Sequence, residues 1–275
     1  MLAGVVLISA CSHDSSVPPF TASGYADNQG AMRIWRLDSN GEVHLLAAFS
    51  PWRHGNTSTS EYRWQGDRLT LIELNVYGKP TEHIRARFDD QGELSFMQRE
   101  VDGQKQQLSS DQVALYRYRA TQIRRTSDAL RQGRVVLRQG RWHANQTVTT
   151  CEGQTVKPDL DARALAHIER RQNHSSVEVS VAWLEASDGA QLLLVANEDF
   201  CTWQPQEKNL LTSCQRRFAL SARLPFPLSS STIRFSEAGS RTSSVTGWRA
   251  DDKKTGDSRM KPPVNEACYE VTLRR

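Results

Sequence analysis

Cys11 is the residue whose setting predicts the clearest chemistry in this chain. It closes the run Leu7-Ile8-Ser9-Ala10-Cys11, which ends an uncharged and almost wholly apolar N-terminus, and the polar, turn-rich residues 12–19 follow it. This arrangement is typical of a bacterial lipobox, at which a signal segment is removed and the new N-terminal cysteine is acylated. We therefore expect Cys11 to be a lipidation site whose fatty-acyl chains, such as palmitate, anchor the protein in a membrane.

The segment before Cys11 is too short to cross a bilayer. Its ten residues form a helix of about 15 Å, half of a hydrocarbon core of about 30 Å, which fits the apolar region of a signal peptide. Ser12 favours sorting to the outer membrane, so the expected location is the cell envelope, facing the periplasm. No Lys or Arg precedes Cys11, which leaves two alternatives open: a start codon upstream of Met1, or an apolar N-terminus with a chance cysteine.

The remaining cysteines are candidates for disulfide chemistry. If Cys11 is acylated, Cys151, Cys201, Cys214 and Cys268 allow three pairings. An oxidising periplasm permits disulfides, and we favour Cys151 with Cys201 because both lie in the patterned part of the chain. Such a closure stabilises the fold by about 4 kcal/mol in the chain-entropy model. Small buried thiols are the alternative, and a zinc site is less favoured because no Cys-x-x-Cys or paired histidine spacing accompanies them.

Other residues with catalytic potential are dispersed. His167 and His174 are seven apart with Glu169 between them, so a surface metal site is conceivable, although two exposed histidines at a helix end explain the spacing better. Asp159 and Asp161 form a paired carboxylate that helix capping explains more simply. The chain contains no Gly-x-Ser-x-Gly, P-loop, Gly-x-Gly-x-x-Gly or His-Glu-x-x-His motif. We therefore predict no catalytic residue, no cofactor and no metal site, and a protein that is not an enzyme.

Two further residue sets suggest binding surfaces. The first is a band of arginines on a predicted helix: Arg117, Arg119, Arg124, Arg125 and Arg131. It is suited to anionic lipid headgroups or lipopolysaccharide, but the solvated side of an amphipathic helix is the simpler interpretation. The second set is aromatic and is expected in cores and at sheet rims, where an exposed pair would indicate a binding face. It comprises Trp35, Trp64, Trp142, Trp183 and Trp203.

The net charge of +4 is unevenly distributed over the 275 residues. Residues 209–275 contain 12 Lys and Arg against 6 Asp and Glu, which leaves the first 208 residues with 23 basic and 25 acidic side chains. A nearly neutral body lacks the basic footprint of a nucleic-acid-binding protein. We therefore expect no nucleic acid partner.

The elements that must position these residues begin with a series of predicted strands. Residues 31–37 and 43–49 alternate apolar and polar side chains around Asn40-Gly41, the strongest short-range signal of a hairpin. Residues 51–60 are predicted to be a looser connection. Further strands are predicted over residues 61–64, 68–76, 82–88 and 94–101. Together they predict an antiparallel meander with one buried and one solvated face.

A helix is predicted after the meander. Ser109 and Gln112 have capping-box spacing, Gly133 is a natural C-cap, and a modest apolar stripe lies between them. The stripe consists of Val113, Tyr116, Ala120, Ile123, Ser127 and Leu130. The helix should pack on the sheet or bridge to the following unit.

A second strand-rich unit is predicted over residues 134–208. It has a strand at 134–137, a hairpin from Gly140-Arg141-Trp142 to Cys151, a helix from Asp159 or Asp161 to Arg171, and strands at 177–183 and 191–196. Residues 209–275 are rich in Ser, Thr and Pro and have no lasting periodicity, which predicts a disordered tail. A sharper hypothesis is that this tail is an out-of-frame or read-through extension.

Several segments together resemble a known family. The lipobox, Phe20-Thr21-Ala22-Ser23-Gly24-Tyr25, residues 89–99 and residues 140–153 are similar to the YjaH-like lipoproteins of enteric bacteria, which carry the domain of unknown function 1481. The resemblance covers about residues 11–208 and excludes the tail. It implies an anchored, periplasm-facing protein and transfers no catalytic residue. The Gly-x-Trp strand and its cysteine-containing hairpin are also similar to small barrels of envelope-stress and copper-homeostasis lipoproteins, which serves only as a hint of the fold.

The sequence thus predicts an α+β protein that is mainly antiparallel β. We expect a signal and lipidated cysteine at 1–11, a tether at 12–22, a meander plus helix at 23–133, a small barrel-like or curved-sheet unit at 134–208, and the tail at 209–275. The expected function is non-enzymatic binding of an unknown protein or component of the envelope. A periplasmic sensor of a metal or small ligand is the alternative.

Overall fold

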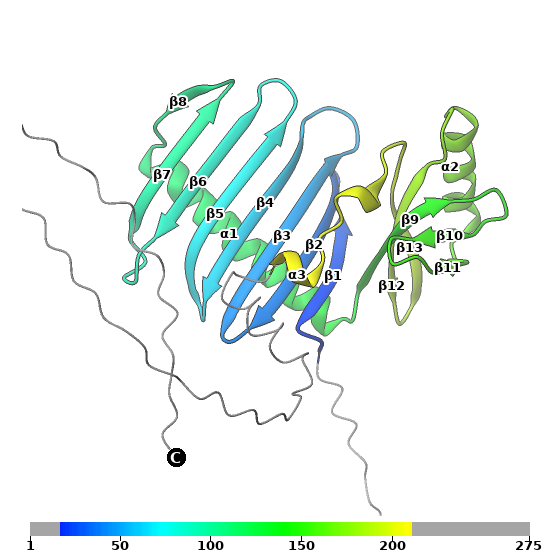
Figure 1. The fold of residues 1–275 in the computed structure, drawn as a ribbon, viewed down its shortest axis with the longest axis horizontal. Helices are drawn as coiled ribbons and strands as arrows, with labels where there is room; N and C mark the ends of the chain where they lie inside the picture. Colours follow the sequence, from blue (N-terminus) through cyan, green and yellow to red (C-terminus); the bar gives the residue numbers. More distant parts are fainter. Residues whose placement is uncertain (1–16, 211–275) are drawn as a thin grey trace, which may run out of the picture. The chain divides into compact units, whose positions relative to one another are not determined.

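The computed structural model describes residues 17–210, which form two antiparallel sheets (Figure 1). The first sheet has eight strands in chain order, and the second has five in the order β11-β10-β9-β12-β13. Three cysteines that the sequence analysis discussed lie outside the described residues: Cys11, the predicted lipidation site, Cys214 and Cys268. The predicted tail beyond residue 210 also lies outside them.

The first sheet comprises β1 (Phe20–Ala26), β2 (Gly30–Ser39), β3 (Glu42–Pro51), β4 (Thr57–Gln65), β5 (Arg68–Tyr77), β6 (Glu82–Phe88), β7 (Leu94–Val101) and β8 (Gln104–Gln106). The second comprises β9 (Val136–Trp142), β10 (Val148–Thr150), β11 (Thr155–Val156), β12 (Ser180–Ala186) and β13 (Gly189–Ala196). The helices are α1 (Ser110–Gln132), α2 (Ala162–Asn173), the 3₁₀ turn η1 (Phe200–Thr202) and α3 (Glu207–Leu210).

The meander predicted from the sequence is confirmed. Asn40 and Gly41 join β2 to β3 with φ angles of 52° and 77°, values typical of the tight turn whose twist matches that of antiparallel strands. Along β6, Ile84, Ala86 and Phe88 are buried while the residues between them are more exposed. The sheet therefore has one strongly apolar face, as the alternating sequence requires.

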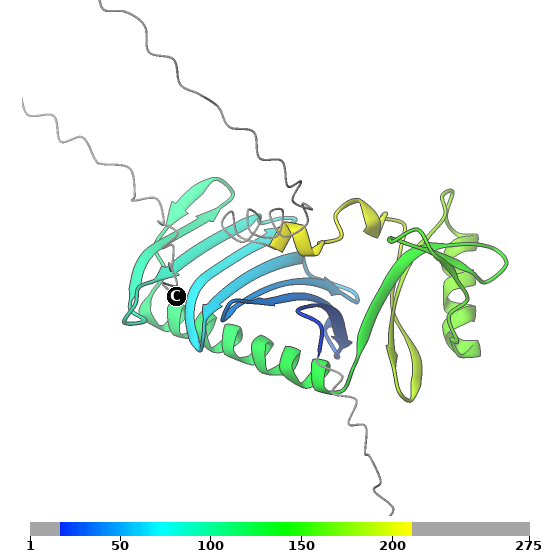
Figure 2. The same ribbon diagram turned by 60° about the horizontal axis from the view of Figure 1, so that its bottom comes forward.

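Helix α1 covers that apolar face (Figure 2). Its N-terminus carries the predicted capping box: the Ser109 hydroxyl accepts a hydrogen bond from the Gln112 backbone N–H (3.3 Å), and the Gln112 side chain accepts one from the Ser109 N–H (2.9 Å). Ala120, Ile123 and Ser127 are its buried residues. The capping box and the stripe predicted from the sequence are confirmed.

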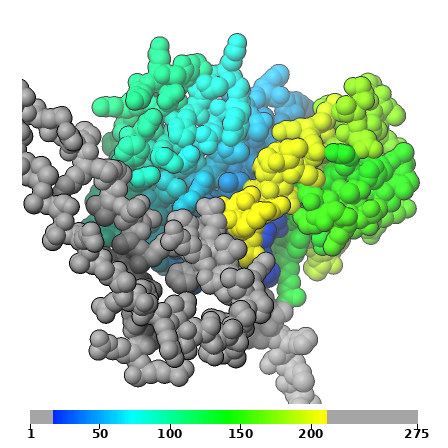
Figure 3. Space-filling view, in the orientation of Figure 1, coloured from blue at the N-terminus to red at the C-terminus, as the bar shows by residue number. Residues whose placement is uncertain are grey.

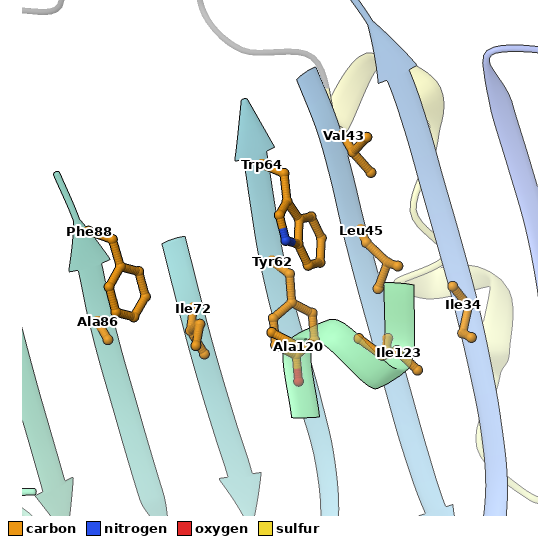
Figure 4. Packing of buried hydrophobic residues seen from close by; sticks show 11 residues of the cluster. Ile34, Val43, Leu45, Tyr62, Trp64, Ile72, Ala86, Phe88, Ala120 and Ile123 are labelled. Carbon is orange, nitrogen blue, oxygen red and sulfur yellow. The ribbon is translucent and has the colours of Figure 1, made fainter. Parts of the chain in front are cut away.

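The core beneath α1 is formed by side chains from β2 to β6 (Figure 4). Ala120 and Ile123 of the helix pack among aromatic and aliphatic residues of the strands. The strand residues are Ile34, Val43, Leu45, Tyr62, Trp64, Ile72, Ala86 and Phe88. Burial of this apolar surface, at about 25 cal/mol per Å², is the main stabilising contribution of the helix.

The second sheet is open, so the barrel-like form considered for this unit is not observed. Its core contains Trp142 and Trp183, both buried, together with Ile168 of α2. A Cβ atom on Gly140 would lie 2.2 Å from the Thr149 carbonyl oxygen, so the close approach of β9 to β10 requires glycine at this position. Asp161, one of the two predicted caps, accepts a hydrogen bond from the Ala164 N–H and begins α2.

Residues 199–210, which we call the C-terminal strap, contact both sheets (Figure 3). Phe200 and Leu210 are buried in a core shared with β2 and β3 of the first sheet and β9, β12 and β13 of the second. The disulfide Cys151–Cys201, with an S–S length of 2.03 Å, attaches the start of the strap to the residue that follows β10. The structure thus pairs the two cysteines that the sequence favoured.

Arg33 of β2 lies at the centre of this shared core. Its guanidinium carbon is 4.4 Å from the Phe200 ring centroid and 4.6 Å from that of Trp203, and its Nη1 donates to the Gln139 side chain of β9 (3.2 Å). Arg33 is only 2% exposed. Burial lowers the pKa of its guanidinium from the usual value for arginine to about 10, although the charge of Glu198 opposes the shift. The aromatic rings and one amide therefore surround a largely dehydrated cation.

The end of the strap is held by His44 of β3. Its Nδ1 lies 2.6 Å from the Leu210 carbonyl oxygen, and its Nε2 lies 2.9 Å from a carboxylate oxygen of Glu61 on β4. Arg63 also contacts this carboxylate, at 2.8 Å. Burial opposes ionisation of Glu61, but the contacts with His44 and Arg63 outweigh it and lower the pKa of the carboxyl from 4.5 to about 2.

Several predicted boundaries were wrong. The strands predicted over residues 134–137 and 177–183 are Val136–Trp142 and Ser180–Ala186 in the structure. Strand β1 begins at Phe20, inside the range 12–22 predicted to be a tether, and β4 begins at Thr57, inside the connection predicted over 51–60. Both strands are short of alternating apolar residues, and backbone pairing with β2 and β3 determines them. The predicted tail began at residue 209, but Leu210 is 2% exposed in the shared core. The packed body therefore includes α3.

Replacement of Arg33 tests how the cation is accommodated. We expect Arg33→Lys to destabilise the protein more than Arg33→Met, by about 1 to 2 kcal/mol. The compact ammonium of lysine is strongly hydrated and cannot stack on the two aromatic rings as a planar guanidinium does, whereas methionine keeps apolar contact with them. Urea unfolding at neutral pH measures both variants. Equal stability of the lysine variant and the wild type would contradict this account.

Acid unfolding tests the contact between His44 and Glu61. Because the folded-state pKa of Glu61 is depressed from 4.5 to about 2, its contribution to stability is present above pH 4.5 and is lost as the pH falls toward 2. The loss is on the order of 3 kcal/mol. Urea unfolding between pH 5 and 2 should show a smaller acid-induced decrease for Glu61→Gln than for the wild type. Parallel pH profiles for the two proteins would refute the assignment.

Candidate ligand-binding hollow

An exposed tryptophan, Trp52, follows directly after β3 and is fixed in place. Its indole N–H donates to the Asp27 carbonyl oxygen (2.7 Å), and its backbone N–H donates to the Gln29 carbonyl oxygen (3.0 Å). Its side chain nevertheless is 43% exposed. A rigid aromatic ring that faces solvent can bind a ligand with little loss of conformational entropy.

The turn that holds Trp52 is itself rigid. The Asp27 carboxylate accepts hydrogen bonds from the backbone N–H groups of Gln29 (2.7 Å) and Gly30 (2.9 Å). A Cβ atom on Gly30 would lie 2.6 Å from the Phe49 ring, so a glycine lets the turn pack against β3. The short polar turn between β1 and β2 therefore determines the orientation of the indole.

Trp52 separates two hollows, which we call together the Trp52 hollow. One has a volume of about 720 Å³ and lies against the β1–β2 turn and residues 53–55; the other, of about 520 Å³, lies against α2 and β13. The first is lined by Asn28, Gln29, Phe49, Pro51, Trp52, Arg53, His54 and Gly55. The second is lined by Pro51, Trp52, His167, Arg171, Leu192, Leu193, Leu194 and Val195.

The lining of the Trp52 hollow is basic. It contains Arg53, His54, His167 and Arg171 and no Asp or Glu. Within residues 17–210, none of these four side chains forms an ion pair with a carboxylate; Arg171 donates through Nε to the Asn197 amide (2.9 Å). A site with an exposed indole, apolar strand residues and uncompensated basic groups is suited to an anionic ligand that also has an apolar or ring face.

Helix α2 places two of the basic residues together. His167 and Arg171 are four residues apart, which puts them on one side of the helix, while Ile168 is buried against the second sheet. The same helix separates the residues considered for a metal site. His174 is the C-cap and its Nδ1 contacts the Arg170 carbonyl oxygen (2.7 Å), and no group of three potential metal ligands is found among the described residues.

The predicted arginine band of α1 is divided by the structure. Arg117 lies 4.4 Å from the Phe88 ring centroid and donates to the Gly92 carbonyl oxygen, and Arg124 lies 5.3 Å from the Trp64 ring centroid. Arg131 pairs with the Asp38 carboxylate. These three arginines attach the helix to the first sheet. They therefore form neither the site for anionic lipid headgroups nor the fully solvated helix face that the sequence analysis considered. Arg119 and Arg125 remain exposed.

Most of the predicted tryptophans are core residues, as expected. Trp35, Trp64, Trp142 and Trp183 are buried, and Trp203 packs edge-on against Trp35 with a centroid distance of 5.5 Å. The sequence analysis missed Trp52. A signal existed, because Pro51-Trp52-Arg53-His54-Gly55 places an aromatic residue between a proline and two basic residues at the end of a strand.

Comparison with known proteins identifies the family. The family model described as "Protein of unknown function (DUF1481)" matches residues 22–206. The chain belongs to this family. It is similar to the "Uncharacterized protein YjaH" of Escherichia coli (strain K12), with 76% identity over 209 residues that cover 76% of this chain and 90% of that protein. No solved structure matches the chain significantly.

The resemblance stated from the sequence is therefore confirmed at the level of the DUF1481 family. The matched range 22–206 contains Trp52, the four basic residues of its hollow and the disulfide cysteines. None of the helices among residues 17–210 has the length and apolar character that crossing a bilayer requires.

Proposed function

We propose that this DUF1481 protein is a non-enzymatic envelope lipoprotein that binds an anionic glycan of the envelope in the Trp52 hollow. The lipid on Cys11 anchors the protein, facing the periplasm, in the outer membrane. The observation that carries the binding proposal is a fixed, exposed indole between hollows lined by four basic residues and no carboxylate.

A phosphorylated or carboxylated sugar matches this chemistry better than a purely apolar ligand. The flat face of an indole packs on the apolar face of a sugar ring, and arginine forks bind phosphate or carboxylate in two-point contacts. The two volumes, about 720 and 520 Å³, are within the range of small-ligand sites. Arg53 and Arg171 belong to the two different hollows, so a ligand that reaches both must pass over Trp52.

Labelling in cells tests the anchor. We expect radiolabelled palmitate to be incorporated into the wild-type protein and lost in Cys11→Ala, because the thiol is the proposed acylation site. The alanine variant should also leave the membrane fraction. Unlabelled wild-type protein that is recovered free of the membrane would overturn the anchoring part of the proposal.

Titration of the purified protein with deacylated lipopolysaccharide oligosaccharide tests the hollow. Arg171→Gln should weaken binding about tenfold or more, since one lost charge-assisted hydrogen bond corresponds to about 1.5 to 3 kcal/mol. Trp52→Ala should weaken it by a similar factor, because it removes the aromatic face on which the sugar ring packs. Arg170→Gln is the matched control, because Arg170 is exposed on the same helix and outside the lining. Calorimetry measures the affinities at two salt concentrations.

Three outcomes would contradict the hollow as the binding site. The first is equal weakening by Arg170→Gln and Arg171→Gln. The second is equal affinity for a neutral oligosaccharide, because the basic lining should discriminate by charge. The third is a thermal shift with copper or zinc but none with the oligosaccharide, which would favour the metal-sensor alternative.

A further inference from the structure

Strand β13 has a free edge that borders the part of the Trp52 hollow next to α2. It is the last strand in the order of the second sheet, and among residues 17–210 it pairs only with β12. One side of its backbone therefore presents N–H and C=O groups that no other strand of this region satisfies. These groups are available to hydrogen-bond a ligand in the hollow.

The lining of the hollow places it along the edge of β13 and not over one face of the sheet. Four consecutive residues of the strand, Leu192, Leu193, Leu194 and Val195, line it. Leu192 and Val195 pack against the core of the second sheet, whereas Leu193 and Leu194 pack against the core shared with the first sheet. A hollow bordered by residues from both faces follows the backbone between them, over a length of about 13 Å.

The edge of β13 lacks the features that protect the other sheet edges. Long exposed edges pair with other chains, so proteins shorten them, cover them or place charges and proline on them. β1 lies against β9, β8 has three residues and includes Lys105, and β11 has two residues and precedes Lys157 and Pro158. By contrast, β13 has eight residues without charge or proline, and a bulge at Leu193 is the one irregularity in its pairing. Such an edge is suited to pairing with an added extended peptide.

A cation lies at the end of this edge. Arg171 of α2 donates through Nε to the side-chain oxygen of Asn197 (2.9 Å), the residue that follows β13. Arg171 is exposed, and no carboxylate among residues 17–210 pairs with it. A planar guanidinium that is held through Nε can bind a carboxylate through its terminal nitrogens. Arg171 is therefore placed to bind a carboxylate of a chain that pairs with β13.

We propose that the ligand of the Trp52 hollow is a glycopeptide, in which a short extended peptide is attached to the anionic sugar. The peptide backbone pairs with the free edge of β13, a peptide carboxylate binds Arg171, and the sugar ring packs on the Trp52 indole. This inference rests on the proposed function, because it names the class of glycan that occupies the same site. The length of edge that borders the hollow accommodates about three or four peptide residues.

Titration with defined fragments of the bacterial cell wall tests the peptide contact. The probe is N-acetylglucosaminyl-N-acetylmuramic acid with a tetrapeptide, and the control is the same disaccharide without the peptide, which keeps a carboxylate on the sugar. By calorimetry, the purified protein should bind the glycopeptide about tenfold more tightly or better, because only this ligand can pair with β13. Equal affinities would overturn the glycopeptide assignment and leave the proposed glycan site in place.

Methylation of the peptide backbone tests the strand pairing itself. In an added strand, the N–H groups of successive residues point alternately toward and away from the sheet. N-methylation at one of two adjacent peptide residues should therefore abolish the gain in affinity, whereas methylation at the other should leave it. The glycopeptide should also slow hydrogen exchange in residues 189–196 more than the disaccharide does. Tolerance of both methylations, or no added protection of β13, would refute the pairing.

Arg171→Gln tests the carboxylate contact. The wild type should bind the glycopeptide about tenfold more tightly than the same ligand with amidated peptide carboxylates. This preference should be lost in Arg171→Gln and kept in Arg170→Gln, whose exposed side chain lies outside the lining. A preference that survives in Arg171→Gln would contradict the contact. Failure of both the glycopeptide and the lipopolysaccharide oligosaccharide to bind would refute the proposed function together with the glycopeptide assignment.

Discussion

Attachment of the C-terminal strap to both sheets is the constraint on which the rest of the structure depends. The disulfide joins Cys201 to Cys151 beside β10, and the rings of the neighbouring residues Phe200 and Trp203 contact the guanidinium of Arg33 from β2. Leu210 then reaches His44 of β3. A segment of twelve residues (199–210) thus joins elements that are far apart in the sequence, and the covalent link reduces the entropy lost when it docks.

The buried arginine in this junction is electrostatically unusual. Within residues 17–210 no carboxylate forms an ion pair with Arg33, and aromatic faces with the Gln139 amide take the place of a counterion. Gln139 in turn donates to Gln204 (2.8 Å), which donates to Glu152 (2.7 Å). A chain of neutral amides therefore leads from the buried cation to an exposed acid, and it fixes the strap in one position against β9.

Local sequence patterns predicted the first sheet well because its contacts are local. Each strand pairs with the next one, so the Asn40-Gly41 turn and the alternation in β6 contain almost all of the required information. The capping box at Ser109 likewise acts within one helical turn. Strand β1 and the first half of β4 were missed because their polar residues are ordered by pairing with neighbours, which no single-strand periodicity reveals.

The candidate site was harder to predict for the same physical reason. Trp52 meets His167 and Arg171 only when the end of β3 lies against α2 and β13, so more than a hundred residues of sequence separate groups that line one hollow. In the arginine band, spacing correctly predicted a shared helix but not which side chains face the sheet. Arg117, Arg124 and Arg131 recur every seven residues, and this period distinguishes them from Arg119 and Arg125.

Strand β1 runs from Phe20 to Ala26 and leads directly into the Asp27 turn that supports Trp52 (Figure 1). Its seven residues rise about 3.4 Å each and so span a little over 20 Å. Because β1 is paired along its whole length with β2, the strand is rigid and its length does not vary. The distance between the Phe20 end of β1 and Trp52 is therefore constant and is about the length of a short glycan. A group that holds the Phe20 end also sets the position of Trp52.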